Sequence, residues 1–130
     1  MKKIIYSLLT VMLVASMSAC NGNKAEKQAD EWLTEKAKAT ATPQNIGAGS
    51  TLVLCSYDNK TLSYRIETTA DSLLAINVDT LRSNTVRNWK TNLNSQEILE
   101  KLSAAEAKVK YTYIAGTDSI VMTLTLDDFK

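Results

Sequence analysis

The chain has 130 residues, which is enough for a single domain. Its 15 basic and 14 acidic residues give a net charge of +1, and this balance excludes the basic excess that nucleic-acid-binding domains carry. The sequence contains no histidine, so the commonest general base and the commonest zinc ligand are both absent.

Residues 1–19 have the pattern of a secretory signal. Lys2 and Lys3 form a positively charged start, residues 4–14 are almost entirely apolar, and small residues follow up to Ala19. This apolar run is shorter than the roughly 20 residues that a membrane-spanning helix needs. A cleaved signal is therefore favoured over its alternative, an uncleaved membrane anchor.

The end of the signal reads Met17-Ser18-Ala19-Cys20 and resembles the processing box of bacterial lipoproteins, with Met17 where leucine is usual. The resemblance implies cleavage before Cys20, a diacylglycerol on its thiol and an acyl chain on the new amine, which together anchor a protein stably. Asn21 stands where enterobacterial lipoproteins carry the aspartate that retains them at the inner membrane. We therefore expect an outer-membrane lipoprotein, on the periplasmic or the surface side. Ordinary secretion with cleavage after Ser18 is the alternative.

Residues 20–50 are expected to form a tether that contains a helix. Residues 24–39 are rich in Ala, Glu and Lys, which favour helices, but Trp32 and Leu33 are the only large apolar side chains there. We expect a solvated spacer helix, with a helix docked on the domain as the sharper alternative. Residues 40–50 contain the only proline and two of the four glycines, and they are predicted to be a linker.

Residues 51–130 are predicted to form a small α+β domain. Residues 51–67 indicate a hairpin around Asp58-Asn59. Residues 72–92 are ambiguous, because apolar residues at 74, 76 and 78 alternate as in a strand while the longer pattern has helical spacing; we predict a helix. A second helix is expected to follow the cap Asn94 and to end at Ala105.

The last part of the chain is predicted to be another hairpin, with its turn at Gly116. Hairpin, helices and hairpin give a four-stranded, mainly antiparallel sheet with one or two helices packed on one face. The strand order does not follow from the pattern.

Catalytic, cofactor-binding and metal-ligating residues are not expected. Cys55 lies within a strand and has no neighbouring charge that would favour a thiolate, so it is interpreted as a buried packing residue. If Cys20 is not lipidated, a Cys20–Cys55 disulfide is the alternative. The carboxylates fall at turns, caps and the C-terminal end, and they do not suggest an acid–base pair.

Tyr64, Tyr111 and Tyr113 are expected to lie on one face of the sheet. They could form a face that binds a partner or a glycan, because tyrosine offers apolar area with a polar tip. The alternative is that these rings line the core. The basic residues Arg82, Arg87 and Lys90 on the predicted long helix are interpreted as a solvated face rather than a ligand site.

Two further resemblances concern bacteria of the Bacteroidetes type. The stretches "LSYRIE", "VKYTYIAG" and "LTLDDF" resemble small lipoproteins of unknown function from these bacteria, and this likeness implies no activity. Three Asp-Ser/Thr-apolar triplets resemble the acceptor sequences of their general O-glycosylation systems. The resemblance implies possible O-glycosylation at Ser72, Thr80 and Ser119.

Together these features predict a lipid-anchored envelope protein with a non-catalytic role. The first hypothesis is an accessory protein that contacts the membrane through the lipid on Cys20 and holds an envelope protein partner, without binding nucleic acid. The second is a module that binds a ligand or glycan, or inhibits another protein, through the tyrosine face or an edge strand. A hydrolase is a third and remote class.

Overall fold

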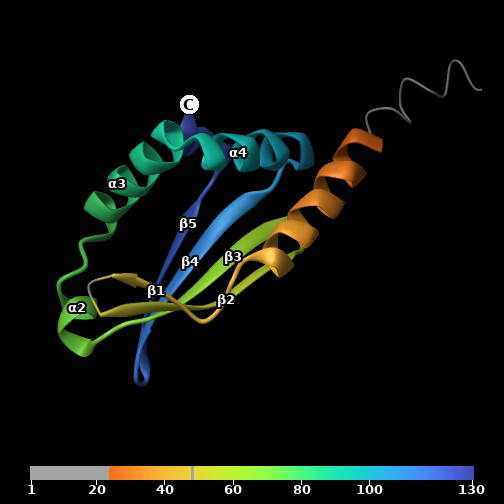
Figure 1. Cartoon of the computed structure of the whole chain (residues 1–130). Helices are drawn as coiled ribbons and strands as arrows, with labels where there is room; N and C mark the ends of the chain where they lie inside the picture. The colour runs from red at the N-terminus through yellow and green to blue at the C-terminus, as the bar shows by residue number, and fades with distance from the viewer. Residues whose placement is uncertain (1–23, 48) are drawn as a thin grey trace, which may run out of the picture.

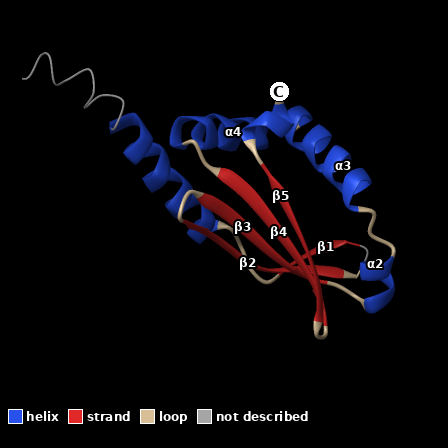
Figure 2. Cartoon of the chain, turned by 180° about the vertical axis from the view of Figure 1, so that it is seen from behind, coloured by secondary structure: helices blue, strands red, loops and turns tan. Residues whose placement is uncertain are grey.

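The computed structural model describes residues 24–47 and 49–130. The fold has two layers, a single sheet and a set of helices that lie on one of its faces (Figures 1 and 2). The predicted signal and the predicted lipidation site, Cys20, lie outside the described residues. No helix in the described part of the chain is long and apolar enough to cross a membrane.

The sheet has five strands in the order β1-β2-β3-β4-β5, and only the β3–β4 pair is parallel. This confirms the predicted α+β class and the mainly antiparallel character, but the predicted number of four strands is wrong. The helices between β3 and β4 carry the chain back to the same end of the sheet, and this crossover makes the central pair parallel. The strands are β1 (Gln44–Gly47), β2 (Ser50–Asp58), β3 (Thr61–Glu67), β4 (Lys108–Ala115) and β5 (Asp118–Leu124).

The extra strand comes from the segment that was predicted to be a linker. Residues 44–47 pair with the start of β2, with Gln44 opposite Leu52, and the register shifts between Asn45 and Gly47. Gly47 has a φ of +95°, which glycine adopts without steric cost. The glycines that suggested a linker thus belong to an irregular hairpin, in which β1 forms an exposed edge strand.

The turn between β2 and β3 is displaced by one residue from the prediction. Asn59 and Lys60 have φ values of 50° and 58°, the conformation that two-residue hairpin turns require, whereas Asp58 is the last residue of β2. The closing hairpin turns at Gly116, as predicted, with a φ of +64°.

The single helix predicted over residues 72–92 is two helices, α2 (Ala70–Leu74) and α3 (Val78–Thr91). The chain breaks because Asn77 is in an extended conformation and its side chain accepts a hydrogen bond from the N–H of Thr80. Asn77 therefore caps a new helix. Leu74, one of the apolar residues in this ambiguous segment, is 84% exposed.

Helix α4 (Leu93–Ala105) ends at the predicted residue but begins earlier than expected. Its cap is Asn92, whose side chain accepts hydrogen bonds from the N–H groups of Asn94 and Ser95, so the predicted cap Asn94 lies inside the helix. The C-terminal cap, Glu106, has a φ of 56°. A short 3₁₀ helix, η1 (Leu126–Phe129), closes the chain.

The N-terminal helix, residues 24–39, packs onto the sheet instead of standing free. Its small residues Ala29 and Ala37 and the intervening Leu33 are buried, because alanines let the helix backbone approach its neighbours closely. Lys60 at the β2–β3 turn lies 2.6 Å from carboxylate oxygens of both Glu26 and Asp30. The apolar side of this helix is therefore closely packed against the sheet. The prediction of a solvated spacer helix is corrected by this contact.

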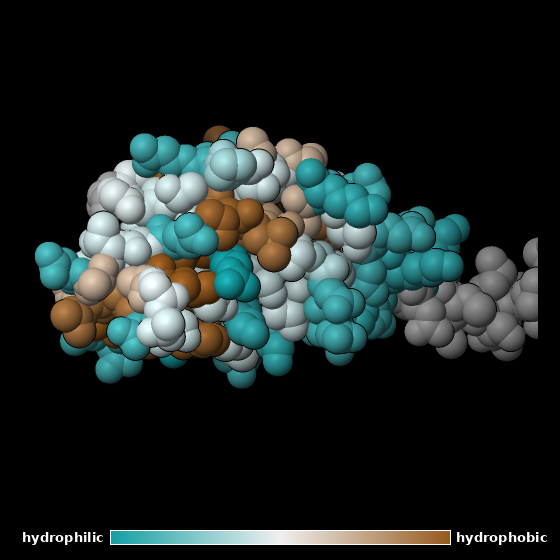
Figure 3. All heavy atoms as spheres, turned by 90° about the horizontal axis from the view of Figure 1, so that it is seen from below, coloured by the Kyte–Doolittle hydropathy of each residue, from teal (hydrophilic) through white to brown (hydrophobic). Residues whose placement is uncertain are grey.

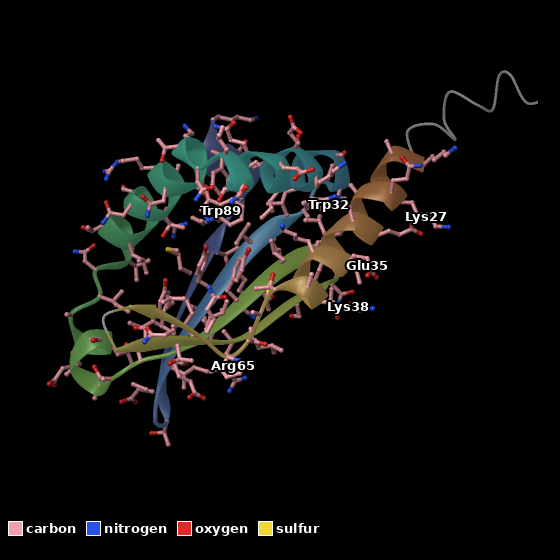
Figure 4. All side chains as sticks on the ribbon, viewed as in Figure 1. Lys27, Trp32, Glu35, Lys38, Arg65 and Trp89 are labelled. Atoms are coloured by element: carbon pink, nitrogen blue, oxygen red, sulfur yellow. The ribbon has the colours of Figure 1, made fainter. Side chains whose placement is uncertain are left out.

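Trp32 joins this helix to α4. The Lys101 ammonium of α4 lies 5.6 Å from the centre of the Trp32 ring, within the range of a cation–π contact. Figure 4 shows Trp32 on the side of the N-terminal helix nearest α4, and Lys27, Glu35 and Lys38 pointing away from the sheet. The N-terminal helix and α4 thus cover the same end of the sheet.

The core lies between this end of the sheet and the helices. The largest fully buried side chains come from the N-terminal helix, α4 and three strands: Leu33, Leu62, Leu102, Val109, Met122 and Leu124. A second buried group, Leu52, Ile66 and Leu73, lies where α2 follows β3.

Candidate functional site

The helices cover the inner face of the sheet unevenly. Along β4, Val109 is 0% exposed, whereas Tyr111 and Tyr113 on the same face are only partly buried. Along β5, Met122 is 1% exposed and Ile120 is again only partly buried. The inner face therefore has a closed part under α4 and the N-terminal helix and, farther along β4 and β5, a partly buried part that lies beside the second buried group at Leu52 and Ile66.

We call this partly buried part the tyrosine zone, and it consists of Cys55, Tyr64, Tyr111, Tyr113 and Ile120. The α3 residues that pack against the neighbouring core, Val78, Leu81 and Val86, are likewise only partly buried. Cys55, Tyr64 and Tyr111 also pack against this core, and they are partly buried. Figure 3 shows the molecule from below, with hydrophobic residues gathered among hydrophilic ones on this side.

The sheet register brings the three predicted tyrosines together. Tyr64 of β3 pairs with Tyr111 of β4, and Ile66 pairs with Tyr113, so all three tyrosine side chains lie on one face. The Tyr64 and Tyr111 rings stack with centroids 5.0 Å apart, and the Tyr111 and Tyr113 rings stack at 6.2 Å. The rings form a continuous row across the two central strands.

Trp89 fixes one end of this row, and its role was not foreseen from the sequence. Its indole N–H donates a hydrogen bond to the hydroxyl of Tyr111 over 3.0 Å, and its ring meets Tyr64 edge-on at 6.4 Å. Figure 4 shows Trp89 below α3 on the side of the strands. The helical spacing from Leu81 through Thr85 to Trp89 was the signal that could have identified it as a contact between helix and sheet.

The hydroxyls of the row are neutral under ordinary conditions. Burial raises the pKa of Tyr111 to about 12, partly offset by the hydrogen bond from Trp89. Burial also raises the pKa of Tyr64 and of Tyr113. The zone therefore offers apolar ring surface with neutral hydroxyls, which suits recognition better than proton transfer.

Cys55 lies beside the row, since it pairs with Tyr64 in the register, and it is a half-buried free thiol. Burial raises the pKa of this thiol, and the smaller effect of a hydrogen bond with Thr40 does not reverse the shift. A neutral thiol is a weak nucleophile. Cys55 thus contributes packing surface to the zone.

The described residues do not supply the donors of a metal site. Residues 24–47 and 49–130 contain no group of three or more Cys, Asp or Glu side chains placed to hold a metal ion. Asp30 accepts hydrogen bonds from Tyr57 and Lys60. Burial acts to raise the pKa of Asp30, but the hydrogen bonds from Lys60 and Tyr57 and the positive charge of Lys60 together hold the pKa below its usual value. Asp30 is a structural anchor for the N-terminal helix.

The three serine and threonine residues of the Asp-Ser/Thr-apolar triplets are dispersed over three elements. Thr80 lies exposed in the first turn of α3, and Ser119 lies exposed near the start of β5. Ser72 lies in α2, where its hydroxyl accepts a hydrogen bond from Thr69, and it is only partly exposed. None of the three belongs to the tyrosine zone.

The basic residues Arg82, Arg87 and Lys90 line a groove of about 410 Å³ between α3 and η1, together with Ser83, Val86 and Asp128. Arg82 donates a hydrogen bond to the backbone carbonyl of Thr123 in β5 over 2.7 Å. Arg82 therefore ties α3 to the edge strand, while Arg87 and Lys90 remain exposed.

The fold is shared with three bacterial proteins of known structure. A protein of Pseudomonas aeruginosa described as secreted superimposes with a TM-score of 0.68 at 14% identity, covering 82% of this chain and 96% of its own. The pilotin EpsS of the Vibrio vulnificus type 2 secretion system gives 0.65 at 12% identity, with 83% and 97% covered. The pilotin AspS of the Vibrio cholerae type II secretion system gives 0.62 at 9% identity, with 82% and 96% covered.

At such low identities the likeness concerns the fold. No protein-family model matches the chain, and no curated protein matches it in sequence. The similarity spans almost the full length of all three proteins, so this small α+β fold is a complete unit in each of them.

Proposed function

We propose that this chain is a lipid-anchored, non-catalytic accessory protein of the bacterial cell envelope that binds a protein partner through the tyrosine zone. The observation that carries the proposal is the incomplete cover of the inner sheet face, where the row of Tyr64, Tyr111 and Tyr113 remains partly exposed beside Ile120.

The chemistry of the zone supports a protein partner. The centres of protein interfaces are rich in aromatic residues and poor in charged ones, and the zone consists of three tyrosines, an isoleucine and a neutral cysteine. Trp89 and the stacked rings hold this surface in one conformation, so little side-chain entropy is lost when a partner binds.

The fold of the pilotins EpsS and AspS supports an accessory role in protein secretion. This part of the proposal rests on analogy of fold, because a fold alone does not determine a function. The absence of histidine from the sequence also favours binding over catalysis.

The lipid attachment at Cys20 is proposed from the signal sequence. Cys20 lies only a few residues before the described N-terminal helix, and that helix is joined to the sheet by Leu33 and by the contacts of Asp30 with Tyr57 and Lys60. A lipid at Cys20 would hold the folded unit close to the outer membrane, on its periplasmic or surface side, without a long spacer. O-glycosylation at Ser72, Thr80 and Ser119 stays a proposal that intact-mass measurement of the native protein would test.

Partner binding is tested by two adjacent substitutions on β5. Ile120→Asp places a charge in the tyrosine zone, whereas Val121→Asp places the same charge on the opposite face of the sheet, where Val121 is 51% exposed. Each tagged full-length protein is isolated with mild detergent from envelopes of its own host. We expect one stoichiometric partner with the wild type and with Val121→Asp, and its loss with Ile120→Asp under conditions in which urea unfolding shows that this variant is still folded. Equal recovery with both variants contradicts the proposal.

The second function, binding of a glycan, is favoured by the row of stacked tyrosine rings, since flat aromatic surface also suits sugar rings. The two functions separate in a thermal-shift assay with soluble envelope glycans. A shift that Tyr113→Ala abolishes, without a copurifying protein, favours the glycan. The anchor is tested with Cys20→Ala, for which we expect no mature protein in the detergent phase, because any protein found there should be precursor that still carries its apolar signal.

A further inference from the structure

The groove between α3 and η1 lies apart from the tyrosine zone and carries an unbalanced positive charge. Its lining includes three cations, Arg82, Arg87 and Lys90, and one carboxylate, Asp128. Val86 and Ser83 complete the wall that α3 contributes. Arg82, Val86 and Lys90 follow each other at intervals of four residues and therefore form one stripe along the helix.

The single carboxylate is already engaged inside the fold. An oxygen of Asp128 accepts a hydrogen bond from the backbone N–H of Thr125 over 2.8 Å, which caps η1, and lies 3.8 Å from the Arg82 guanidinium. Arg82 in turn donates to the carbonyl of Thr123. These contacts account for one of the three cations.

The other two cations have no Asp or Glu partner among the described residues. Within residues 24–47 and 49–130, no Asp or Glu carboxylate lies within 4.0 Å of the Arg87 guanidinium or of the Lys90 ammonium, and the Lys90 ammonium donates a hydrogen bond to the main-chain oxygen of Lys130 over 3.3 Å. Both side chains are exposed at the groove. Arginine is suited to bidentate recognition of a carboxylate, and lysine adds a flexible point charge.

We infer that this groove binds an acidic peptide segment, and that the segment belongs to the partner held by the tyrosine zone. The second part of this inference, that the segment belongs to this partner, rests on the proposed function. The stripe from Arg82 to Lys90 extends over roughly 12 Å, a length that accommodates about four extended residues, whereas a single small anion would engage only part of it. Val86 supplies apolar surface for the peptide backbone or a methylene group. Charge complementarity at the groove and apolar contact at the zone would then fix the partner's register together.

The groove is tested directly with a fluorescein-labelled hexaglutamate peptide and the full-length protein in detergent, by fluorescence anisotropy at low salt. The test variant is R87E/K90E, and the matched control is K108E/K110E, which reverses two exposed lysines of β4 on the outer face. We expect at least about tenfold weaker peptide binding for R87E/K90E and less than about threefold for the control. Binding of the wild type should weaken as sodium chloride rises from 50 to 500 mM, because salt screens the charges.

Three results would overturn the inference. The first is the absence of peptide binding by the wild type at low salt. The second is equal weakening in R87E/K90E and K108E/K110E, which indicates nonspecific charge attraction. The third is stronger binding to phosphatidylglycerol vesicles than to the peptide, lost in R87E/K90E, which assigns the groove to a membrane surface.

Capture of the partner is an independent measurement, and it separates a failure of this inference from a failure of the proposed function. If the partner captured by the wild type is recovered equally with R87E/K90E, the acidic segment is not part of that partner, while the function of the tyrosine zone stands. If no partner is captured by any variant, the proposed function fails, and the peptide measurement still decides whether the groove binds acidic peptides.

Discussion

The packing of the N-terminal helix onto the sheet is best tested by Leu33→Ala. Leu33 is 0% exposed in the closed part of the core. The change removes three carbons, each contributing about 0.8 kcal/mol on burial, or about 2.4 kcal/mol together. The neighbouring helix residues Ala29 and Ala37 are too small to fill the space that remains, so a cavity term of about 1 kcal/mol adds to this loss. We expect a total of about 3 kcal/mol.

The assay is urea unfolding of the full-length protein, followed by circular dichroism and by tryptophan fluorescence. With a slope of about 1.5 kcal/mol per molar urea, the midpoint should fall by about 2 M. Leu93→Ala is the matched control, because Leu93 is 79% exposed in α4 and the same deletion there should cost no more than about 0.5 kcal/mol. Equal midpoints for the two variants would refute the reasoning and return the helix to the role of a free spacer.

Three further predictions concern single side chains. Folding lowers the pKa of Asp30 from 3.8, so the contribution of its carboxylate to stability is present above pH 3.8 and is lost as the pH falls through the lower pKa of the folded protein. In a series of urea midpoints measured at decreasing pH, Asp30→Asn should therefore show a smaller decrease at acidic pH than the wild type. The pKa of Tyr111 is raised from 10.0 to about 12, so the stability linked to its neutral form is complete below pH 10 and is lost between pH 10 and 12. In Tyr111→Phe, absorbance at 295 nm should therefore show one fewer late-titrating tyrosine. The same substitution should cost about 1–3 kcal/mol of stability, because it leaves the buried Trp89 N–H without a hydrogen-bond partner. Glu106 has a φ of 56° at the end of α4, so Glu106→Gly should raise stability in thermal unfolding by about 0.5–1 kcal/mol, whereas an unchanged or lower midpoint would speak against strain there.

The sheet strands were largely predictable because their alternation is local. Val109, Tyr111 and Tyr113 alternate with polar residues, and this period of two placed the tyrosines on one face before any tertiary contact was known. The parallel pairing of β3 with β4 was not predictable in the same way, since it depends on where the intervening helices return the chain.

The wrong predictions concern segments whose local sequence pattern is compatible with two structures. Asn77 can continue a helix or cap a new one, and the capping hydrogen bond to Thr80 decides this only in three dimensions. The Ala29, Leu33 and Ala37 stripe looked too small to bury, yet small residues permit the closest helix packing. The contribution of Trp89 to the site could not be predicted, because it depends on how α3 packs and brings Trp89 against Tyr111 of β4.

The central claim is that a protein partner contacts the inner face of the sheet at the tyrosine zone. Its most direct test places the photo-crosslinking residue benzoylphenylalanine at Tyr113, on the inner face, or at its neighbour Thr112, on the outer face, in the full-length protein in its own host. We predict one defined crosslinked product from position 113 and none from position 112. The same product from both positions, or from position 112 alone, would contradict the account.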